Sequence, residues 1–371
     1  MVGAPNELRS SPVNPKVSTT DVLRARLASE SLPGQRSDDY RVALAVEGGG
    51  MRAVVSSGML LALEQLGFGD AFDLVVGTSA GSLASAFFVA SQATEGSVLF
   101  YTDLNSSPFL DKRNAIKRRQ AIDLDYLVDT ASRRRGLEYE HLRESAVELW
   151  ATVCPVDDDN PTRLFKVEGD NDRIGAILKA SAALPVLGGA SRYVDGEAYV
   201  DGGLSEQIPW RSAMDLGATH ILVLPSRAVG DVEEASRTNF VEKFATTRIV
   251  GSMHGDRVAD LVGALPESAA AQAISLLGIA GGFASAVDSS CNHWDGHLEL
   301  VDIASDVPVP ARLETKRPLL VDGLIGGAQS VLDHFGLGSV AVEQRVVLQH
   351  AEVSVHELRS EQLRSVIRRT L

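Results

Sequence analysis

The sequence predicts an α/β protein with three layers, in which helices cover both faces of a mostly parallel central sheet. Three observations lead to this prediction. The run Val42-Ala43-Leu44-Ala45-Val46 is continuously apolar, as expected for a parallel strand buried on both faces. A glycine-rich turn follows and leads into a helical pattern, and the same strand–turn–helix order recurs around Ser79. The composition is that of an ordinary globular protein, with 44% hydrophobic and 23% charged residues.

The first two helices and the strand between them follow from apolar spacing. Apolar residues at helical spacing predict a helix that starts near Val55 and ends at Gly67. The run Phe72–Val76 predicts a second short buried strand. A second helix follows Ser79, with one face lined by Leu83, Ala86, Phe87 and Ala90. This order is typical of a βαβ unit with parallel strands.

The next elements are marked by shorter signals. Strands are expected at Glu148–Cys154 and Leu164–Val167. Asp172 is expected to cap a helix. Asp195-Gly196 is expected to turn a hairpin over residues 193–200, and His220–Leu224 reads as another buried strand.

The chain divides into three expected parts. Residues 1–37 are polar and proline-containing and are interpreted as a tail, with one helix that Ser18-Thr19-Thr20-Asp21 could cap. Residues 38–310 form the expected α/β domain, and residues 311–371 a C-terminal helical extension. Beyond residue 230 the pattern is mostly helical, with one strand candidate at His297–Ile303.

Composition and charge exclude several classes of protein. The formal net charge of −14 argues against a nucleic-acid partner, which would need a basic surface. The two cysteines, Cys154 and Cys291, have no metal-ligand spacing and are expected to be reduced thiols of a cytoplasmic protein. No secretory signal is visible at the start. The apolar stretch 269–287 is rich in Ala and Gly and predicts a helical hairpin rather than a transmembrane helix.

The basic segment Lys112–Arg119 has two interpretations. It could contact anionic head groups, which would bring the protein to a membrane surface as a peripheral protein. The commoner explanation, a solvated helix face, is favoured. The sequence indicates no oligomeric state.

Gly77-Thr78-Ser79-Ala80-Gly81 fits the G-x-S-x-G pattern of a nucleophile elbow. In such an elbow the serine lies on a tight turn between a strand and a helix, and its hydroxyl is exposed. The helix N-terminus then favours developing negative charge beside Ser79. The bare pattern is common in turns of small residues, but its place between an apolar strand and an amphipathic helix favours a catalytic serine.

Gly48-Gly49-Gly50 is open to two interpretations. As an oxyanion hole, its N–H groups would bind the tetrahedral oxygen of an acyl-transfer intermediate, and each donor would contribute roughly 3 kcal/mol in the transition state. Arg52 would steady this loop or add positive charge. As a phosphate-binding turn, it would begin a dinucleotide fingerprint whose third glycine is replaced by Ala53. The oxyanion hole is favoured because a nucleotide site leaves Ser79 and Asp201 without a role.

Asp201-Gly202-Gly203 follows the expected hairpin, and its glycines would let the backbone approach another segment closely. On spacing alone a turn aspartate is the commoner explanation. Asp195 is such a turn residue and serves as an internal control. An ester-cleaving site needs an anion cradle, a nucleophile and a base, and the three glycine-rich motifs together could supply all of them.

These motifs resemble the three marks of the patatin-like phospholipases. The glycine loop with Arg52, the turn at Gly77–Gly81 and the Asp201-Gly202-Gly203 segment carry the resemblance. The segment Ala180–Pro185 is similar to the family's stretch before the aspartate. It covers about residues 42–224, and the form of Val46–Arg52 is similar to bacterial members. The chain departs from the family pattern at Ala53 and at Glu206-Gln207, neither of which replaces a catalytic group.

The resemblance implies a serine esterase or lipid acyl hydrolase, similar to a phospholipase A, that works through a Ser–Asp dyad. Asp201 would accept the proton of Ser79, and Ser79 would attack the ester carbonyl of a lipid substrate and form an acyl-enzyme. No metal or organic cofactor is implied. An acyltransferase that uses the same acyl-enzyme and a non-catalytic lipid-binding relative are alternatives. A Ser–His–Asp triad with His254, His293, His297 or a later histidine is a further alternative that no local pattern marks.

Overall fold

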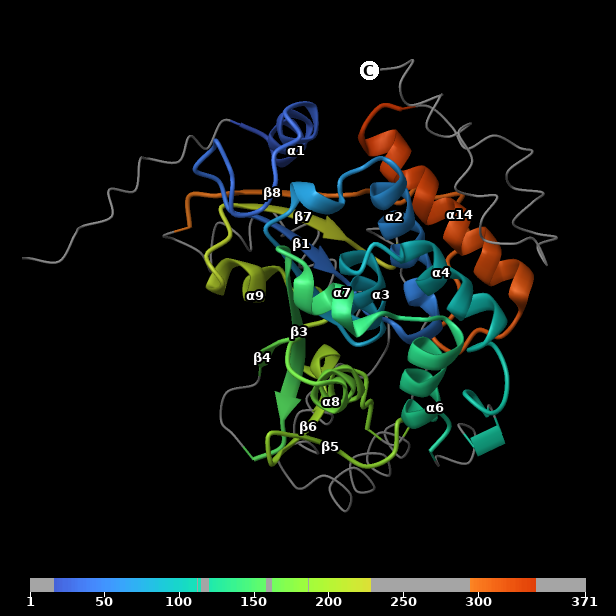
Figure 1. The fold of residues 1–371 in the computed structure, drawn as a ribbon. Coiled ribbons are helices and arrows are strands. Elements are labelled where there is room, and N and C mark those ends of the chain that lie inside the picture. Colours follow the sequence, from blue (N-terminus) through green and yellow to red (C-terminus); the bar gives the residue numbers. More distant parts are fainter. Residues whose placement is uncertain are drawn as a thin grey trace, which may run out of the picture.

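A single mixed sheet lies at the centre of the protein (Figure 1). The computed structural model describes residues 17–111, 113–114, 120–157, 162–185, 187–227 and 294–337. Over these residues, helices flank the sheet on both faces, which is the three-layer α/β/α arrangement that the sequence predicts.

The sheet has the strand order β5-β6-β3-β2-β1-β7-β8, and β4 pairs with β3. Strands β3, β2, β1, β7 and β8 run parallel, whereas β4, β5 and β6 join through antiparallel pairs. The bounds are β1 (Val42–Val46), β2 (Leu74–Thr78), β3 (Glu148–Pro155), β4 (Arg163–Lys166), β5 (Arg192–Val194), β6 (Glu197–Asp201), β7 (His220–Leu224) and β8 (His297–Leu300).

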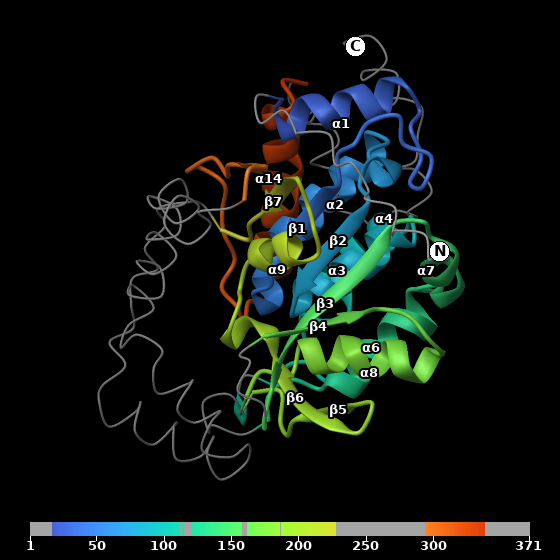
Figure 2. The same cartoon turned by 90° about the vertical axis from the view of Figure 1, so that its left-hand side faces the viewer.

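The helices form two layers of unequal size (Figure 2). Because successive side chains of a strand point to opposite faces, β1 sends Leu44 into the larger apolar cluster and Ala43 into the smaller one. Trp210 of α9 covers the smaller cluster. The bounds are α1 (Thr19–Ala28), α2 (Val54–Gln65), α3 (Ala80–Val89), α4 (Ala93–Thr102), α6 (Leu124–Asp129), α7 (Tyr139–Glu144), α8 (Asn171–Ser181), α9 (Trp210–Asp215) and α14 (Arg317–His334).

Two predicted helix caps have different outcomes. Ser18 caps α1 as expected, and its hydroxyl accepts a hydrogen bond from the amide of Asp21 at 3.0 Å. The expected cap of α8, Asp172, is wrong, because Asp172 already lies inside the helix. Asp170 is the cap, and its carboxylate accepts from the amide of Arg173 at 2.8 Å.

The strand predictions agree with the structure to within a few residues. The second strand begins at Leu74 rather than Phe72, and β8 ends at Leu300 rather than Ile303. The hairpin at Asp195-Gly196 is confirmed, with φ values of 51° and 89°. Two consecutive positive φ values are typical of the tight turns that join hairpin strands.

Helix α14 packs closely along α2, although it lies in the expected C-terminal extension. An added Cβ at Gly58 would lie 2.9 Å from the carbonyl carbon of Leu324, and one at Gly327 would lie 2.8 Å from that of Val55. Glycine at both positions therefore allows the two backbones to approach. Residues 311–337 share the larger apolar cluster with the expected 38–310 domain.

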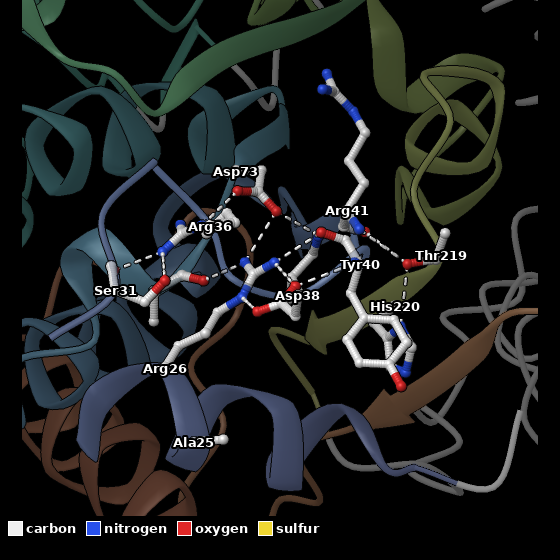
Figure 3. A network of polar contacts seen from close by, with 12 residues as sticks. Ala25, Arg26, Ser31, Arg36, Asp38, Tyr40, Arg41, Asp73, Thr219 and His220 are labelled. Atoms are coloured by element: carbon white, nitrogen blue, oxygen red, sulfur yellow. Dashed lines mark hydrogen bonds and ion pairs between the residues drawn. The ribbon is translucent and has the colours of Figure 1, made fainter. Parts of the chain in front are cut away.

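Helix α1, within the expected tail, is joined to the sheet by a buried charge network (Figure 3). The Arg26 guanidinium, whose side chain is 1% exposed, contacts Asp38 at 2.8 Å and Asp73 at 2.9 Å. Arg36 contacts the second oxygen of Asp73 at 2.8 Å. This network fixes residues 19–38 against the amino end of β2.

Several expectations concern residues outside the described ones. They are the hairpin at 269–287, Cys291, and most of the helical region after residue 230. Cys154 is buried. Within the described ranges, no helix combines the length and the apolar character needed to cross a membrane.

Candidate active site

Ser79 lies on a strained turn between β2 and α3. Its φ and ψ are 55° and −129°, a backbone conformation that residues other than glycine rarely adopt. The flanking glycines are required by close packing: an added Cβ at Gly77 would lie 2.5 Å from the Cα of Ser82, and one at Gly81 would lie 2.7 Å from the carbonyl oxygen of Val46. The turn therefore has the geometry of a nucleophile elbow.

Asp201 comes to Ser79 through the antiparallel strand β6. In the sheet register Thr78 pairs with Thr152, and the next residue of β3, Val153, pairs with Asp201. The ends of β6 and β2 thus lie at the same level of the sheet, one on each side of β3. The Ser79 hydroxyl donates a hydrogen bond to Asp201 Oδ2 at 2.7 Å.

The Asp201 carboxylate is buried and held on both oxygens. It is 3% exposed, and its Oδ1 accepts a hydrogen bond from the Gly203 amide at 2.7 Å. Burial raises the pKa of Asp201 to about 6, while the hydrogen bonds from Ser79 and Gly203 and the charge of Arg312 act in the opposite direction. A carboxylate in this state is a stronger base than an exposed aspartate.

The glycine loop after β1 lies directly against the elbow. An added Cβ at Gly48 would contact the Thr78 carbonyl and would lie 2.8 Å from the Cβ of Ser79. Among the residues that the structure describes, the amides of Gly48 and Gly49 donate no hydrogen bond, so they are available to a ligand. Gly50 has a φ of 60°, which turns the loop into the short helical turn that contains Arg52.

The Arg52 side chain packs against the glycine loop. Its Nε donates to the Ser226 hydroxyl at 3.1 Å, and its guanidinium lies 3.7 Å from the buried carboxylate of Glu47. An added Cβ at Gly49 would lie 3.1 Å from the same Nε. Arg52 therefore packs against Gly49 and adds positive charge near the amides of the loop.

A cavity of about 280 Å³ opens above the elbow. Ser79, Asp201 and the glycine loop line it together with Arg52 and Arg312. Its apolar lining comes from Ile122, Leu184, Leu187, Leu204 and Leu313. Such a cavity suits an apolar chain whose reactive end lies beside a few polar groups.

The histidines expected as triad candidates do not line this cavity in the part of the chain that is described. His297 contacts Thr19 at 3.0 Å. His220, which was not one of these candidates, begins β7 and packs at the edge of the Tyr40 ring. His254 and His293 lie outside the described residues.

The structure adds two site residues that the sequence reasoning did not assign. The Ser181 hydroxyl accepts a hydrogen bond from the Ser79 amide at 3.0 Å and so helps to hold the strained turn. Ser181 lies in the segment Ala180–Pro185, which is part of the family resemblance, and this resemblance was the one signal in the sequence that pointed to Ser181. Arg312 lies far along the chain, and no motif marks it.

Glu206, one of the departures from the family pattern, has a structural role. Its buried carboxylate accepts hydrogen bonds from the amides of Arg211 and Ser212 at 2.9 and 3.2 Å, and so caps the start of α9. Its backbone carbonyl accepts from the Thr78 hydroxyl at 3.1 Å. Glutamate at position 206, where the family pattern differs, therefore still holds the end of β2 next to Ser79.

Comparison with known proteins gives two findings. Residues 44–214 match the family model described as patatin-like phospholipase. The chain is 28% identical over 187 residues to a protein of Escherichia coli (strain K12) named uncharacterized protein YjjU, and this alignment covers 50% of the chain and 51% of that protein. The chain thus spans about half the length of this curated relative. With the three-layer fold, these findings show that residues 44–214 are a patatin-like phospholipase domain.

Proposed function

We propose that the protein is a serine esterase that hydrolyses the carboxylic ester bonds of lipids through a dyad of Ser79 and Asp201. The family of the matched domain supports a lipid ester hydrolase in general. The main support for the dyad is the 2.7 Å hydrogen bond from the Ser79 hydroxyl to the buried carboxylate of Asp201. This pair lies beside the loop with the free amides of Gly48 and Gly49. A serine hydroxyl, a base and an anion cradle in one cavity are what acyl transfer requires.

The first half of the reaction forms an acyl-enzyme. Asp201 Oδ2 accepts the hydroxyl proton as Ser79 Oγ bonds to the ester carbonyl carbon. The carbonyl oxygen becomes an oxyanion, which the amides of Gly48 and Gly49 stabilise. When the intermediate collapses, the bond to the alcohol breaks, and the alcohol leaves with the proton from Asp201.

The second half repeats these steps with water. Asp201 accepts a proton from water, the resulting hydroxide attacks the acyl carbon, and Ser79 leaves with the proton as the free acid forms. The raised pKa of Asp201 supports this role, since a base near neutral pKa can both accept and return a proton. The apolar side chains of the cavity would hold the acyl chain during both steps.

Fluorophosphonate labelling tests the nucleophile directly. The folded protein should gain one phosphonyl group on Ser79, detected by peptide mass spectrometry, and Ser79→Ala should gain none. An ester panel of several chain lengths, with Ser79→Ala as the blank, should then show turnover by the native protein alone. Retained turnover in Ser79→Ala would remove Ser79 from the mechanism.

Two further outcomes identify the alternatives. An acyltransferase would give acylated alcohol or thiol, in place of free acid, when an acceptor is added. A folded protein that binds lipid and takes no label would be a non-catalytic relative.

Contact with a membrane surface is a separate part of the proposal. It rests on the basic segment Lys112–Arg119, most of which lies outside the described residues. Cosedimentation with anionic vesicles that exceeds cosedimentation with zwitterionic vesicles would support it. Equal cosedimentation would contradict it.

A further inference from the structure

The segment before α14 completes the cavity from outside the matched domain. The carbonyl oxygen of Arg312 accepts a hydrogen bond from the Met51 amide at 3.0 Å. An added Cβ at Gly50 would lie 2.6 Å from the same oxygen. The chain around Arg312 therefore lies on the glycine loop, although Arg312 is distant from residues 44–214 in the sequence.

The Arg312 side chain lines the cavity together with Ser79 and Asp201. Within the described part of the chain it forms no hydrogen bond or ion pair, and its Nε is buried without an acceptor. A buried donor without a partner is unfavourable. A ligand that supplies an acceptor would remove this penalty.

The buried arginines of the described residues, Arg26, Arg52 and Arg227, already have polar partners. Arg26 contacts two carboxylates, and Arg52 contacts Ser226 and lies near Glu47. Arg312 therefore differs from them, because it lines the cavity and its side chain has no polar partner among the described residues.

Neither Ser79 nor Asp201 forms a hydrogen bond or ion pair with the Arg312 guanidinium. Both oxygens of Asp201 already accept hydrogen bonds, one from Ser79 and one from Gly203. Arg312 influences Asp201 through its charge, and no ion pair joins the two side chains. Its N–H donors are left for a substrate group next to the scissile ester.

We infer that Arg312 is a specificity residue that binds an anionic oxygen group, a phosphate or a carboxylate, carried by the substrate close to its scissile ester. A planar guanidinium binds such groups through two parallel hydrogen bonds. The inference rests on the proposed esterase function. It narrows the substrate from esters in general to esters with a negative charge near the reacting bond.

Three matched hexanoyl esters test the inference. Their alcohols are glycerol, glycerol 3-phosphate and glycerate, so the acyl chain is constant and the group near the ester is neutral, phosphate or carboxylate. The native protein should have a higher kcat/KM for at least one charged ester than for the neutral ester. The charged ester that is preferred identifies the anionic group.

Arg312→Gln should lower kcat/KM for the preferred charged ester by on the order of tenfold to a hundredfold, mostly through KM. The value for the neutral ester should change by no more than about threefold. For the charged ester, the kcat/KM of Arg312→Lys should lie between those of the native protein and Arg312→Gln, because lysine keeps the charge and loses the paired donors. The Arg312 carbonyl, which contacts Met51, is retained in both variants. Thermal melting would verify that they fold.

Arg133→Gln is the matched control for net charge. Its side chain is 80% exposed and pairs with Asp129 away from the cavity. Its kinetic values should equal those of the native protein. An equal loss on all three esters in Arg312→Gln would overturn the inference, since Arg312 would then act on the dyad. A native preference for the neutral ester would overturn it too.

A binding measurement separates this inference from the proposed function. If the native protein hydrolyses none of the esters, the esterase proposal fails, and the non-hydrolysable ether 1-hexylglycerol 3-phosphate and its glycerate counterpart can be titrated calorimetrically. At least one should bind the native protein more tightly than 1-hexylglycerol does, and Arg312→Gln should remove that preference. Equal binding of the three ethers, or a preference that persists in Arg312→Gln, would overturn the inference.

Discussion

Ser79 Oγ lies 2.7 Å from Asp201 Oδ2, and 122 positions of sequence separate the two residues. The Gly203 amide holds the other oxygen of Asp201, so the carboxylate cannot rotate away without losing that hydrogen bond. The hydroxyl and its acceptor are thus oriented before any substrate arrives. Orientation of this kind lowers the entropy that must be lost in the reaction.

Replacing Ser79 by glycine should relieve backbone strain that alanine would retain. Ser79→Gly and Ser79→Ala both remove the hydroxyl, and only the glycine variant also removes the Cβ from a residue with φ 55°. Ser79→Gly should therefore be more stable than Ser79→Ala by about 1 kcal/mol, the reverse of the order expected in a helix interior. Urea denaturation of both variants measures this difference. An alanine variant of equal or greater stability would show that the turn is not strained.

The two neighbouring aspartates should respond differently to loss of charge. Asp201→Asn should lower kcat for ester hydrolysis by on the order of 10²–10⁴-fold, because the amide cannot accept the Ser79 proton. Asp195→Asn should change kcat by less than about twofold, since Asp195 is an exposed turn residue paired with Arg173. Steady-state kinetics on one ester would measure both. Similar losses at the two positions would contradict the dyad.

Activity should depend on the protonation of Asp201. The base works only when ionised, and its pKa in the folded protein is about 6. The kcat/KM value should therefore decrease about tenfold for each pH unit below about 6 and be constant above it. A pH profile on a neutral ester measures this. An acid limb at the ordinary pKa of 3.8 would show that burial does not tune this carboxylate.

Stability should change in the opposite sense over the same range. The pKa of Asp201 is raised from 3.8 to about 6 on folding, so the folded state binds the proton more tightly than the unfolded state. Its favourable contribution is present below about pH 4 and is lost as the pH rises through 6. Relative to Asp201→Asn, the native protein should lose free energy of unfolding between about pH 4 and pH 7. A difference that is independent of pH would contradict the raised pKa.

The glycine loop should not tolerate a side chain at Gly48. The added methyl of Gly48→Ala would contact the Thr78 carbonyl and the Ser79 side chain, which would displace the elbow or the loop. We expect a loss of kcat by on the order of a hundredfold or more, as when one oxyanion donor is removed. Gly69→Ala is the matched control, because nothing lies within 4 Å of its added Cβ. Full activity in Gly48→Ala would argue against the loop as an anion cradle.

The buried charge network of α1 should contribute strongly to stability. Arg26→Ala leaves Asp38 and Asp73 without their shared partner, and removing one member of a buried ion pair costs about 3–5 kcal/mol. Arg133→Ala removes the exposed pair with Asp129 and should cost less than about 0.5 kcal/mol. Chemical denaturation measures both. Equal small effects would mean that α1 is not part of the folding unit.

Local patterns in the sequence were sufficient for most elements near the site. The continuous apolar run of β1, the hairpin turn at Asp195-Gly196 and the family match at residues 44–214 all appear in the structure or the comparison. Each depends on neighbours in the chain, such as burial on both faces of a strand or two positive φ values in a turn. The cap of α8 was missed by two residues, because several polar residues in a row can each serve as a cap.

The sequence by itself identified the residues that we propose for the chemistry: a serine on a turn that needs glycines, an aspartate before two glycines, and a glycine loop with backbone amides. Tertiary structure alone decided that the Ser79 hydroxyl meets a buried Asp201, that α14 packs on α2, and that Arg312 reaches the cavity. The reason is that sheet register and helix packing bring together residues far apart in the chain. The desolvation that raises the pKa of Asp201 exists only after that packing has formed.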